Sequence, residues 1–508
     1  MQLLTDCRSR LYRSKGRASC QSAAELSPIT AAMSSAAQRC ALQELRSLMF
    51  SLVVSGLSLT LLLFTYSLPA SRRCVSLCRS DLTFQAVNPP EFQTSARPTE
   101  PYITTAGMTV IRGQTAQLLR INGSRTLLTS AYLEHRTKRK EVRIIAIMQR
   151  SERVKLHCHL HCRHQLHVSS AAVRIHRDHF RFRFGTADIL CPVPSGCETP
   201  GYVAVTSAAT KDEEIDNLEF LEVGNQIEQT TFPYNFTCCF SAMYDFTNVL
   251  QLVQSLEMLQ FLGVNRVVVY KTNCSADVQR VLDHYSEKGL VEVIPWSLSK
   301  YLNVSRKASP QQSPGDIHYF GQIPALNDCL YRFMYRSRYV ALHDPDELIL
   351  PQTVGSWMEL LPLLKKKYGA DRCYTFENNW IPMEFELPPP KPNALPAVDQ
   401  WQNVSGVNIL AHLYREPFIP RRRQHNAKII VNPRAVFATS VHGVLQPQKS
   451  CIWVDRKLAR MYHIKPRGPP KHKEKQLIYE GRLLGYSSHL IPAVNAVLKQ
   501  TGLLPEAT

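Results

Sequence analysis

The chain is short of acidic residues: 41 Asp and Glu stand against 60 Lys and Arg, a formal net charge of +19 over 508 residues. Such a charge makes nucleic acid a candidate partner. The most basic part of the chain, residues 135–183, lacks however the pattern of a basic helix. Between positions 135 and 183, thirteen basic residues and three acids follow the alternating pattern of strands instead. This pattern argues against nucleic-acid binding, and an acidic glycan, an anionic lipid or simple solubility explains the charge more simply.

A second absence concerns zinc. Residues 157–167 are dense in Cys and His, but the pair Cys158 and Cys162 has no second Cys pair at a matching spacing. Neighbouring side chains of a strand also point to opposite faces. Twelve of the fifteen cysteines follow residue 68, and an even number suits an oxidising compartment. We therefore expect disulfides here rather than zinc.

Residues 47–68 lack any charged side chain. The run is long enough for a membrane helix of about 20 residues, and it lies too far from the N-terminus for an ordinary cleaved signal peptide. Seven basic residues and three acids precede it, so the positive-inside rule predicts that residues 1–46 are cytoplasmic. Five glycosylation acceptors follow it, at Asn122, Asn235, Asn273, Asn303 and Asn403. We expect a single-pass type II membrane protein whose bulk is lumenal.

The rest of the chain divides by its periodicity. Residues 69–101 are polar and contain prolines, as in a stem. Residues 102–230 carry strand signals, among them 142–148, 173–176 and 180–184, and predict a small β-rich accessory domain. The predicted divisions are a cytoplasmic tail 1–46, an anchor 47–68, a stem 69–101, an accessory domain 102–230, a catalytic domain 231–470 and a C-terminal tail 471–508.

From residue 234 the pattern becomes α/β. Apolar runs at 236–244, 266–270 and 291–295 alternate with helical spacing over 248–262 and around 278–285, and Gly263 and Gly289 end the helices. This alternation predicts a parallel sheet covered by helices. Later segments predict helices at 323–335 and 357–368 and strands at 372–376 and 429–431. Ligands bind such sheets outside the carboxyl ends of the strands.

One such end carries three acids. The apolar run 339–342 leads into Asp344, Asp346 and Glu347. Carboxylates after a buried strand are costly to desolvate unless a cation or hydrogen bonds compensate. Two oxygen ligands one residue apart suit Mg²⁺ or Mn²⁺, which nucleotide-sugar transfer needs to neutralise the departing diphosphate. The plain alternative is a solvated acidic turn.

Other features stay open at this level. The loop 305–316 is either a lid or disordered. Asn327 and Asp328 either contact substrate or belong to an ordinary first helical turn. His442 and His463 each end an apolar segment, where a buried histidine of the core is the plain alternative.

As an ordered set, several segments resemble glycosyltransferase family 92, in particular a vertebrate member similar to its β-1,4-galactosyltransferases. The resemblance covers roughly residues 234–465. The segments are 239–244, 262–270, 281–289, 322–329, 344–347, 428–431, 441–442 and 462–463.

The resemblance implies a GT-A-like mixed sheet, an inverting mechanism, UDP-galactose as donor and Mn²⁺ (or Mg²⁺) as the ion. It also implies a galactose-ended acceptor on glycoprotein or glycolipid, and the Golgi membrane as the location. The implied metal ligands are Asp344, Asp346 and His463, and the implied donor-binding residues are Asp344, Asp346, Lys428 and Lys465. Family members carry His-Tyr-Arg where this chain has His463-Ile464-Lys465, so Lys465 or Arg467 would replace that arginine.

An inverting transfer needs a carboxylate that removes the proton of the acceptor hydroxyl. Glu347 and Glu377 are both candidates. Two rival functions stand beside the transferase: a lumenal glycan-binding protein or pseudoenzyme, and a phosphoryl-transfer enzyme with Asp344 as nucleophile. The second class requires Asp-x-Asp-x-Thr/Val near the start of its domain, which this chain lacks.

Overall fold

The computed structural model describes residues 102–105, 108–111, 118–163, 165–210, 217–420, 426–465 and 472–504. All of them lie in one compact unit, Ala96–Thr508. The predicted cytoplasmic tail, anchor and stem fall outside the described residues. Within the described ranges, no helix is long and apolar enough to cross a bilayer.

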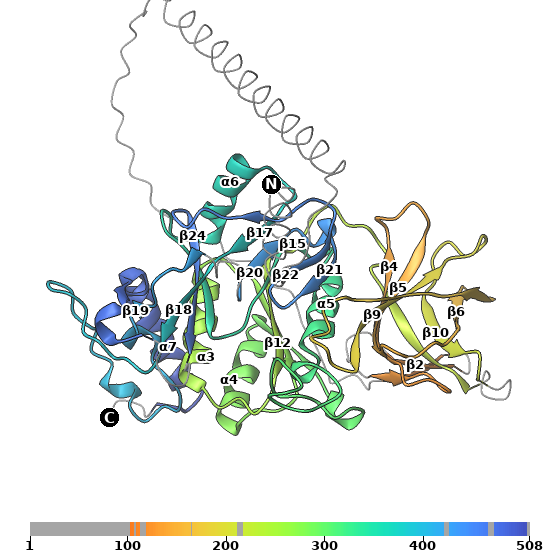
Figure 1. Cartoon of the computed structure of the whole chain (residues 1–508), viewed down its shortest axis with the longest axis horizontal. Helices are drawn as coiled ribbons and strands as arrows, with labels where there is room; N and C mark the ends of the chain where they lie inside the picture. Colours follow the sequence, from red (N-terminus) through yellow and green to blue (C-terminus); the bar gives the residue numbers. More distant parts are fainter. Residues whose placement is uncertain are drawn as a thin grey trace, which may run out of the picture. The chain divides into compact units, whose positions relative to one another are not determined.

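The accessory domain is an eleven-stranded sheet with the order β7-β6-β10-β11-β4-β5-β9-β8, to which β1, β2 and β3 are attached (Figure 1). Strands β4, β5 and β9 form its centre, where their apolar residues are buried. The strands are β1 Tyr102–Thr105, β2 Met108–Ile111, β3 Leu119–Arg120, β4 Leu127–Glu134, β5 Glu141–Gln149, β6 Leu156–Cys162, β7 Gln165–Ser170, β8 Ala172–Ile175, β9 Phe184–Pro192, β10 Tyr202–Ser207 and β11 Glu219–Gly224.

Two predictions in this domain have different outcomes. Cys158 pairs with Cys191 and Cys162 with Cys197, which confirms disulfides for the cysteines of β6. The strand predicted over 180–184 is wrong, because β9 begins only at Phe184. Phe180 and Arg181 have φ of 49° and 67°, values incompatible with a strand, so the chain turns there.

The second domain is built on a seven-stranded mixed sheet with the order β14-β13-β12-β15-β20-β17-β23. The first four strands are parallel, as the alternating pattern predicts, and β20 runs antiparallel to β15. A smaller sheet, β16-β24-β18, adjoins it. The strands of the second domain are β12 Tyr234–Met243, β13 Arg266–Lys271, β14 Val291–Pro295, β15 Ser337–Leu342, β16 Glu347–Pro351, β17 Cys373–Phe376, β18 Asn378–Pro382, β19 Tyr414–Arg415, β20 Lys428–Val431, β21 Val436–Ser440, β22 Gly443–Pro447, β23 Ile452–Trp453, β24 Ala459–Lys465 and β25 Ile478–Tyr479.

Local signals explain where the helices begin and end. The side chains of Asn248 and Ser275 cap α3 and α4, and Ser356 forms a capping box with Glu359 at α6. Gly263 and Gly289 follow α3 and α4 with positive φ, as expected for helix ends. The α-helices are α3 Val249–Phe261, α4 Ala276–Glu287, α5 Gln322–Arg332, α6 Trp357–Tyr368 and α7 Ser487–Gln500.

Helices cover both faces of the larger sheet (Figure 1). Helices α3, α4, α6 and α7 share one apolar core with Phe236 and Phe240 of β12. Helix α5 lies on the other face, where its core includes Cys239 of the same strand and residues of the accessory domain. Four buried residues of α7 belong to the main core, so the segment 471–508, expected as a tail, contributes to the packing of this domain.

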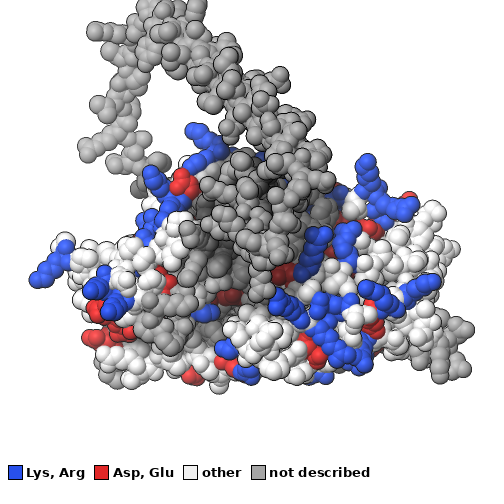
Figure 2. Space-filling model, in the orientation of Figure 1, with Lys and Arg blue, Asp and Glu red and all other residues white. Residues whose placement is uncertain are grey.

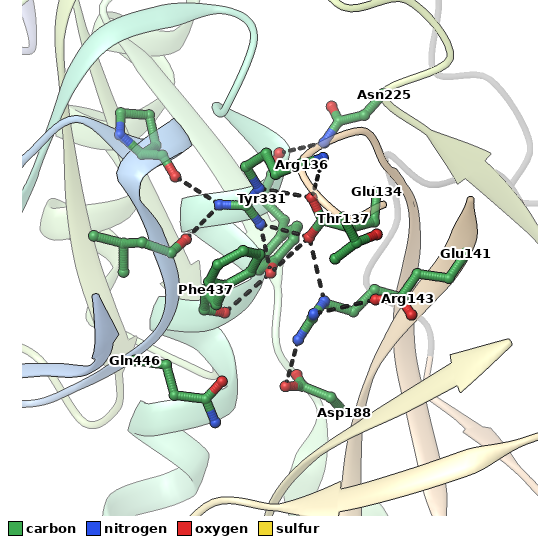
Figure 3. Close-up of polar contacts among 12 residues, drawn as sticks. Glu134, Arg136, Thr137, Glu141, Arg143, Asp188, Asn225, Tyr331, Phe437 and Gln446 are labelled. Carbon is green, nitrogen blue, oxygen red and sulfur yellow. Dashed lines mark hydrogen bonds and ion pairs between the residues drawn. The ribbon is translucent and has the colours of Figure 1, made fainter. Parts of the chain in front are cut away.

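The two domains are joined by a buried polar junction (Figure 3). Arg136 of the accessory domain donates to the backbone oxygen of Val436 at 2.6 Å and to the hydroxyl of Tyr331 on α5 at 2.8 Å. Glu134 pairs with Arg136, and Asp188 pairs with Arg143, at 2.6 and 2.7 Å. Because every charge in this cluster has an opposite partner, the junction holds the accessory domain in one orientation on α5.

Candidate active site

The predicted acidic turn lies where the order of the strands reverses. The chain runs from β12 outward through β13 to β14, and then returns through α5 to β15 on the other side of β12. Parallel strands β12 and β15 therefore end side by side, and Asp344 follows β15 by two residues. This is the crevice in which open α/β sheets bind ligands.

Asp344 is held by side chains from three other elements. The hydroxyl of Ser241 on β12 donates to it at 2.7 Å, the amide of Gln322 on α5 lies at 3.4 Å, and the ammonium of Lys428 on β20 at 3.1 Å. Burial would raise the pKa of Asp344, but Lys428 and Ser241 hold it well below its usual range. Asp344 is thus a charged carboxylate that is already paired with an ammonium.

Asp346 faces a different partner. Strand β24 pairs antiparallel with β16 in a register that sets His463 opposite Glu347. The Nε2 atom of His463 lies 3.2 Å from Asp346, and its Nδ1 atom lies 3.4 Å from Glu347. Burial would raise the pKa of Asp346, but His463 and then Lys465 lower it. The ligand atoms of Asp346, Glu347 and His463 all lie within 4.8 Å of one another, so this group could hold a metal ion.

Glu347 contacts three other members of the cluster. One of its carboxylate oxygens accepts the backbone N–H of Asp344 at 2.8 Å and lies 3.0 Å from Lys428, while the other faces His463. Burial raises the pKa of Glu347, and Lys428 and His463 only partly offset this effect. Its side chain is 2% exposed. Glu347 therefore fixes the positions of groups on β15, β20 and β24 relative to one another.

A cavity of about 570 Å³ opens over these groups, a size suited to a small-molecule ligand. Of the seven residues expected to bind metal or donor or to act as the base, six line it, and so does His442: the six are Asp344, Asp346, Glu347, Lys428, His463 and Lys465. The ammonium of Lys465 lies 3.7 Å from Asp346, and the side chain is 41% exposed, so it can turn toward an anionic ligand. Arg467, the other basic candidate, lies outside the described residues.

Glu377 is placed elsewhere. It pairs with Arg456 at 3.2 Å and lines a separate pocket together with Phe418 and Trp453. Trp380, three residues further along, lies in the larger cavity and packs against His463 with ring centroids 4.5 Å apart. Glu377 directly precedes β18 and Trp380 lies three positions further on, so in an extended chain their side chains point in opposite directions.

Asn327 and Asp328 have structural contacts. Asp328 accepts hydrogen bonds from Tyr132 at 2.6 Å and from Tyr270, and pairs with Arg332 at 2.9 Å. Asn327 donates to the backbone oxygen of Thr439 at 2.8 Å. Both are fully buried, and neither lines the cavity. The sequence did not single out Ser241, although it lies in the segment 239–244 that carries the family resemblance.

The charge of the surface agrees with the composition. On the face drawn in Figure 2, Lys and Arg side chains are spread over the described surface and Asp and Glu are fewer. At the cavity the order is reversed, because three carboxylates lie beside two ammonium groups, those of the buried Lys428 and the partly exposed Lys465. A cation would restore the balance there.

Comparisons with known proteins relate the domain that contains this cavity to a glycosyltransferase family. Residues 234–473 match the family model described as glycosyltransferase family 92. A glycosyltransferase family 92 protein of Caenorhabditis elegans is 23% identical over 144 residues, so the match spans 28% of this chain and 28% of that protein. Among solved structures, a cyclomaltodextrinase is matched over 37% of this chain and 46% of that one, at 11% identity and a TM-score of 0.14, which carries no argument. The family match and the relative support glycosyltransferase family 92 as the family of the region that contains the candidate active site.

Proposed function

We propose that the protein is a metal-dependent inverting glycosyltransferase with a GT-A-like catalytic domain. It would move galactose from UDP-galactose to a galactose-ended glycan, in β-1,4 linkage, on a glycoprotein or glycolipid. The observation that carries this proposal is the cluster of Asp346, Glu347 and His463 at the strand-order reversal, inside a cavity of about 570 Å³. The family match supports a nucleotide sugar as donor.

The residues present fit a divalent cation, because carboxylates suit ions such as Mn²⁺ and imidazole suits first-row transition metals such as Fe²⁺ and Zn²⁺. Asp346 and the Nε2 atom of His463 would hold the ion, and Glu347 would orient His463 through Nδ1 at 3.4 Å. Such a carboxylate behind a histidine ligand fixes the ring and raises its basicity. When bound, the ion would neutralise the diphosphate as it leaves.

The other charged groups have separate tasks. Lys428 keeps Asp344 ionised and holds Glu347, so its charge is used within the protein. Lys465, which is partly exposed at the cavity, would bind a phosphate oxygen of the donor. Of the two carboxylates expected to remove the acceptor proton, only Glu347 lines this cavity, and its three contacts favour a positioning role for it.

We further propose that the chain is a single-pass type II protein of the Golgi membrane with a lumenal catalytic domain. The charge-free run 47–68 and the basic residues before it support this location. Disulfides at Cys239–Cys329 and Cys373–Cys451 suit an oxidising lumen. Among the described cysteines, Cys238 and Cys274 are unpaired.

Release of UDP by the full chain from a panel of UDP-sugars, with Mn²⁺ and with a chelator, tests the proposed reaction. Metal-dependent turnover of UDP-galactose that rises with galactose-ended acceptors is the expected result. A well-folded sample that turns over no donor would instead identify a glycan-binding protein without transfer activity.

A further inference from the structure

One wall of the cavity comes from the accessory domain. Phe180 lines the cavity, and its ring stacks on that of His318 with centroids 4.1 Å apart and planes 16° apart. Close to them, Tyr244 stacks on Phe320 at 4.0 Å. His318 is 4% exposed, and burial lowers its pKa to about 4. Two pairs of uncharged rings therefore meet at this end of the cavity.

The backbone is strained on both sides of this contact. Besides Phe180 and Arg181, Tyr319 and Phe320 have positive φ, at 36° and 48°. Bulky residues adopt this region only when the surrounding structure forces them to, and such outliers cluster at ligand sites. Here four of them lie in the two short segments that bring Phe180 and His318 together.

Hydrogen bonds and the junction hold Phe180 in place. The N–H of Phe184 donates to the backbone oxygen of Asp316 at 2.9 Å, which ties the segment to the loop 303–318. The guanidinium of Arg150 donates to the oxygen of Phe182 at 2.6 Å. Together with the Arg136 junction of Figure 3, these bonds attach the ring to a rigid element of the accessory domain.

The aromatic end lies on the β12 side of the carboxylates. Gln322, four residues after His318, donates to Ser241 of β12 at 2.6 Å. Trp380 and His463 lie on β18 and β24 of the small sheet. A donor whose diphosphate lies at Asp346 can therefore direct its nucleoside toward β12 and its sugar toward Trp380. In doubly wound sheets the nucleotide lies at the strand-order reversal, here the β12 side.

We propose that the accessory domain completes the donor site: Phe180, stacked on His318, forms the wall that holds the nucleobase of a pyrimidine nucleoside diphosphate. This inference rests on the proposed function. An aromatic side chain suits a base because stacking is favourable for every base. The accessory domain is then part of the active site.

The test measures the binding of UDP and of inorganic diphosphate to the full chain in Mn²⁺ by calorimetry. Phe180→Leu keeps the apolar bulk and loses the ring, whereas Phe180→Tyr keeps the ring. We expect Phe180→Leu to weaken UDP binding about tenfold, within the range of base stacking. It should leave inorganic diphosphate unchanged, and Phe180→Tyr should bind UDP like the wild type.

Arg181→Ala is the matched control, since it lies in the same strained turn with an exposed side chain, outside the cavity lining; it should bind UDP normally. If the wild type transfers galactose but Phe180→Leu binds UDP as tightly as the wild type does, this inference alone is overturned. The same holds if Phe180→Leu raises only the KM for the acceptor. A wild type that binds inorganic diphosphate but not UDP would overturn the proposed donor and this inference together. Thermal melting checks that each variant is folded.

Discussion

Two of the charged clusters among the described residues differ in the balance of their charges. At the junction, Glu134 and Asp188 face Arg136 and Arg143. In the active site, Asp344 and Glu347 share the buried ammonium of Lys428, while Asp346 faces His463 and the partly exposed Lys465. The first cluster joins two domains, whereas the second borders a cavity. Buried charge alone therefore does not identify a functional site; an excess of one sign beside an open cavity does.

The largest expected effect is on catalysis at the unbalanced cluster. Asp346→Ala removes a carboxylate that faces His463, so the cation and the diphosphate lose their support. We expect transfer to fall on the order of 10³-fold, as for the loss of metal-based charge stabilisation. UDP release and thermal melting would be measured together. Asp277→Ala, an exposed acid of α4, is the control, and normal turnover by Asp346→Ala would refute the metal assignment.

Substitutions in the junction between the domains should lower the free energy of unfolding. Arg143→Met leaves Asp188 and Glu134 buried without this partner, and removal of one member of a buried pair costs about 3–5 kcal/mol. Urea unfolding would measure the loss. Arg280→Met removes an exposed pair and should cost less than about 1 kcal/mol. Equal stability of the two variants would show that the junction contributes nothing.

A substitution of Glu347 tests whether this residue positions the metal ligand His463 or acts as the general base. Glu347→Gln keeps the shape but weakens the contacts with Lys428 and His463. Loss of a group that orients a metal ligand typically costs about 10- to 100-fold in metal affinity, and calorimetry with Mn²⁺ would measure it. Unchanged Mn²⁺ affinity with a lowered kcat would instead assign Glu347 as the general base.

The free energy of unfolding should fall in acid because His318, which is buried at the cavity, must then be protonated. Its pKa is about 4 in the folded protein and about 6.5 in the unfolded chain. Stability is therefore lost as the pH falls from about 6.5 toward 4, and by pH 5 this histidine accounts for about 2 kcal/mol. His318→Phe removes the titration, so urea unfolding at pH 7 and pH 5 should show a smaller loss. An identical loss in both proteins would contradict this assignment.

The smallest effect is expected at Glu377. It lines a pocket apart from the carboxylate cluster, so Glu377→Gln should leave the rate of transfer close to that of the wild type. Initial rates with saturating donor would measure this. A loss comparable to that of Asp346→Ala would restore Glu377 as a catalytic candidate.

Local patterns predicted most of the α/β domain. Residues such as Asn248, Ser275 and Gly263 set helix ends through contacts a few positions away, so their effect can be read from the sequence. The segment 180–184 was misread, because its alternating pattern is typical of a strand while contacts with His318 hold it in a turn.

The candidate site was predictable only in part. Asp344 and Asp346 stand together in the sequence, but their division of labour depends on Lys428 and His463, which arrive from distant strands. The placement of Glu377 depends on which face of β18 meets the cavity, and that is a matter of sheet packing. Both are consequences of long-range contacts.

Helix α5 bears on how this protein could be recombined with relatives. Its first residue, Gln322, reaches the cavity, while Asp328 binds Tyr132 and Tyr331 binds Arg136 of the accessory domain. A chimera cut near residue 230 would separate Asp328 from Tyr132 and Tyr331 from Arg136, and so mismatch the C-terminal half of this helix. A unit of exchange that keeps α5 with these partners must therefore extend beyond the accessory domain.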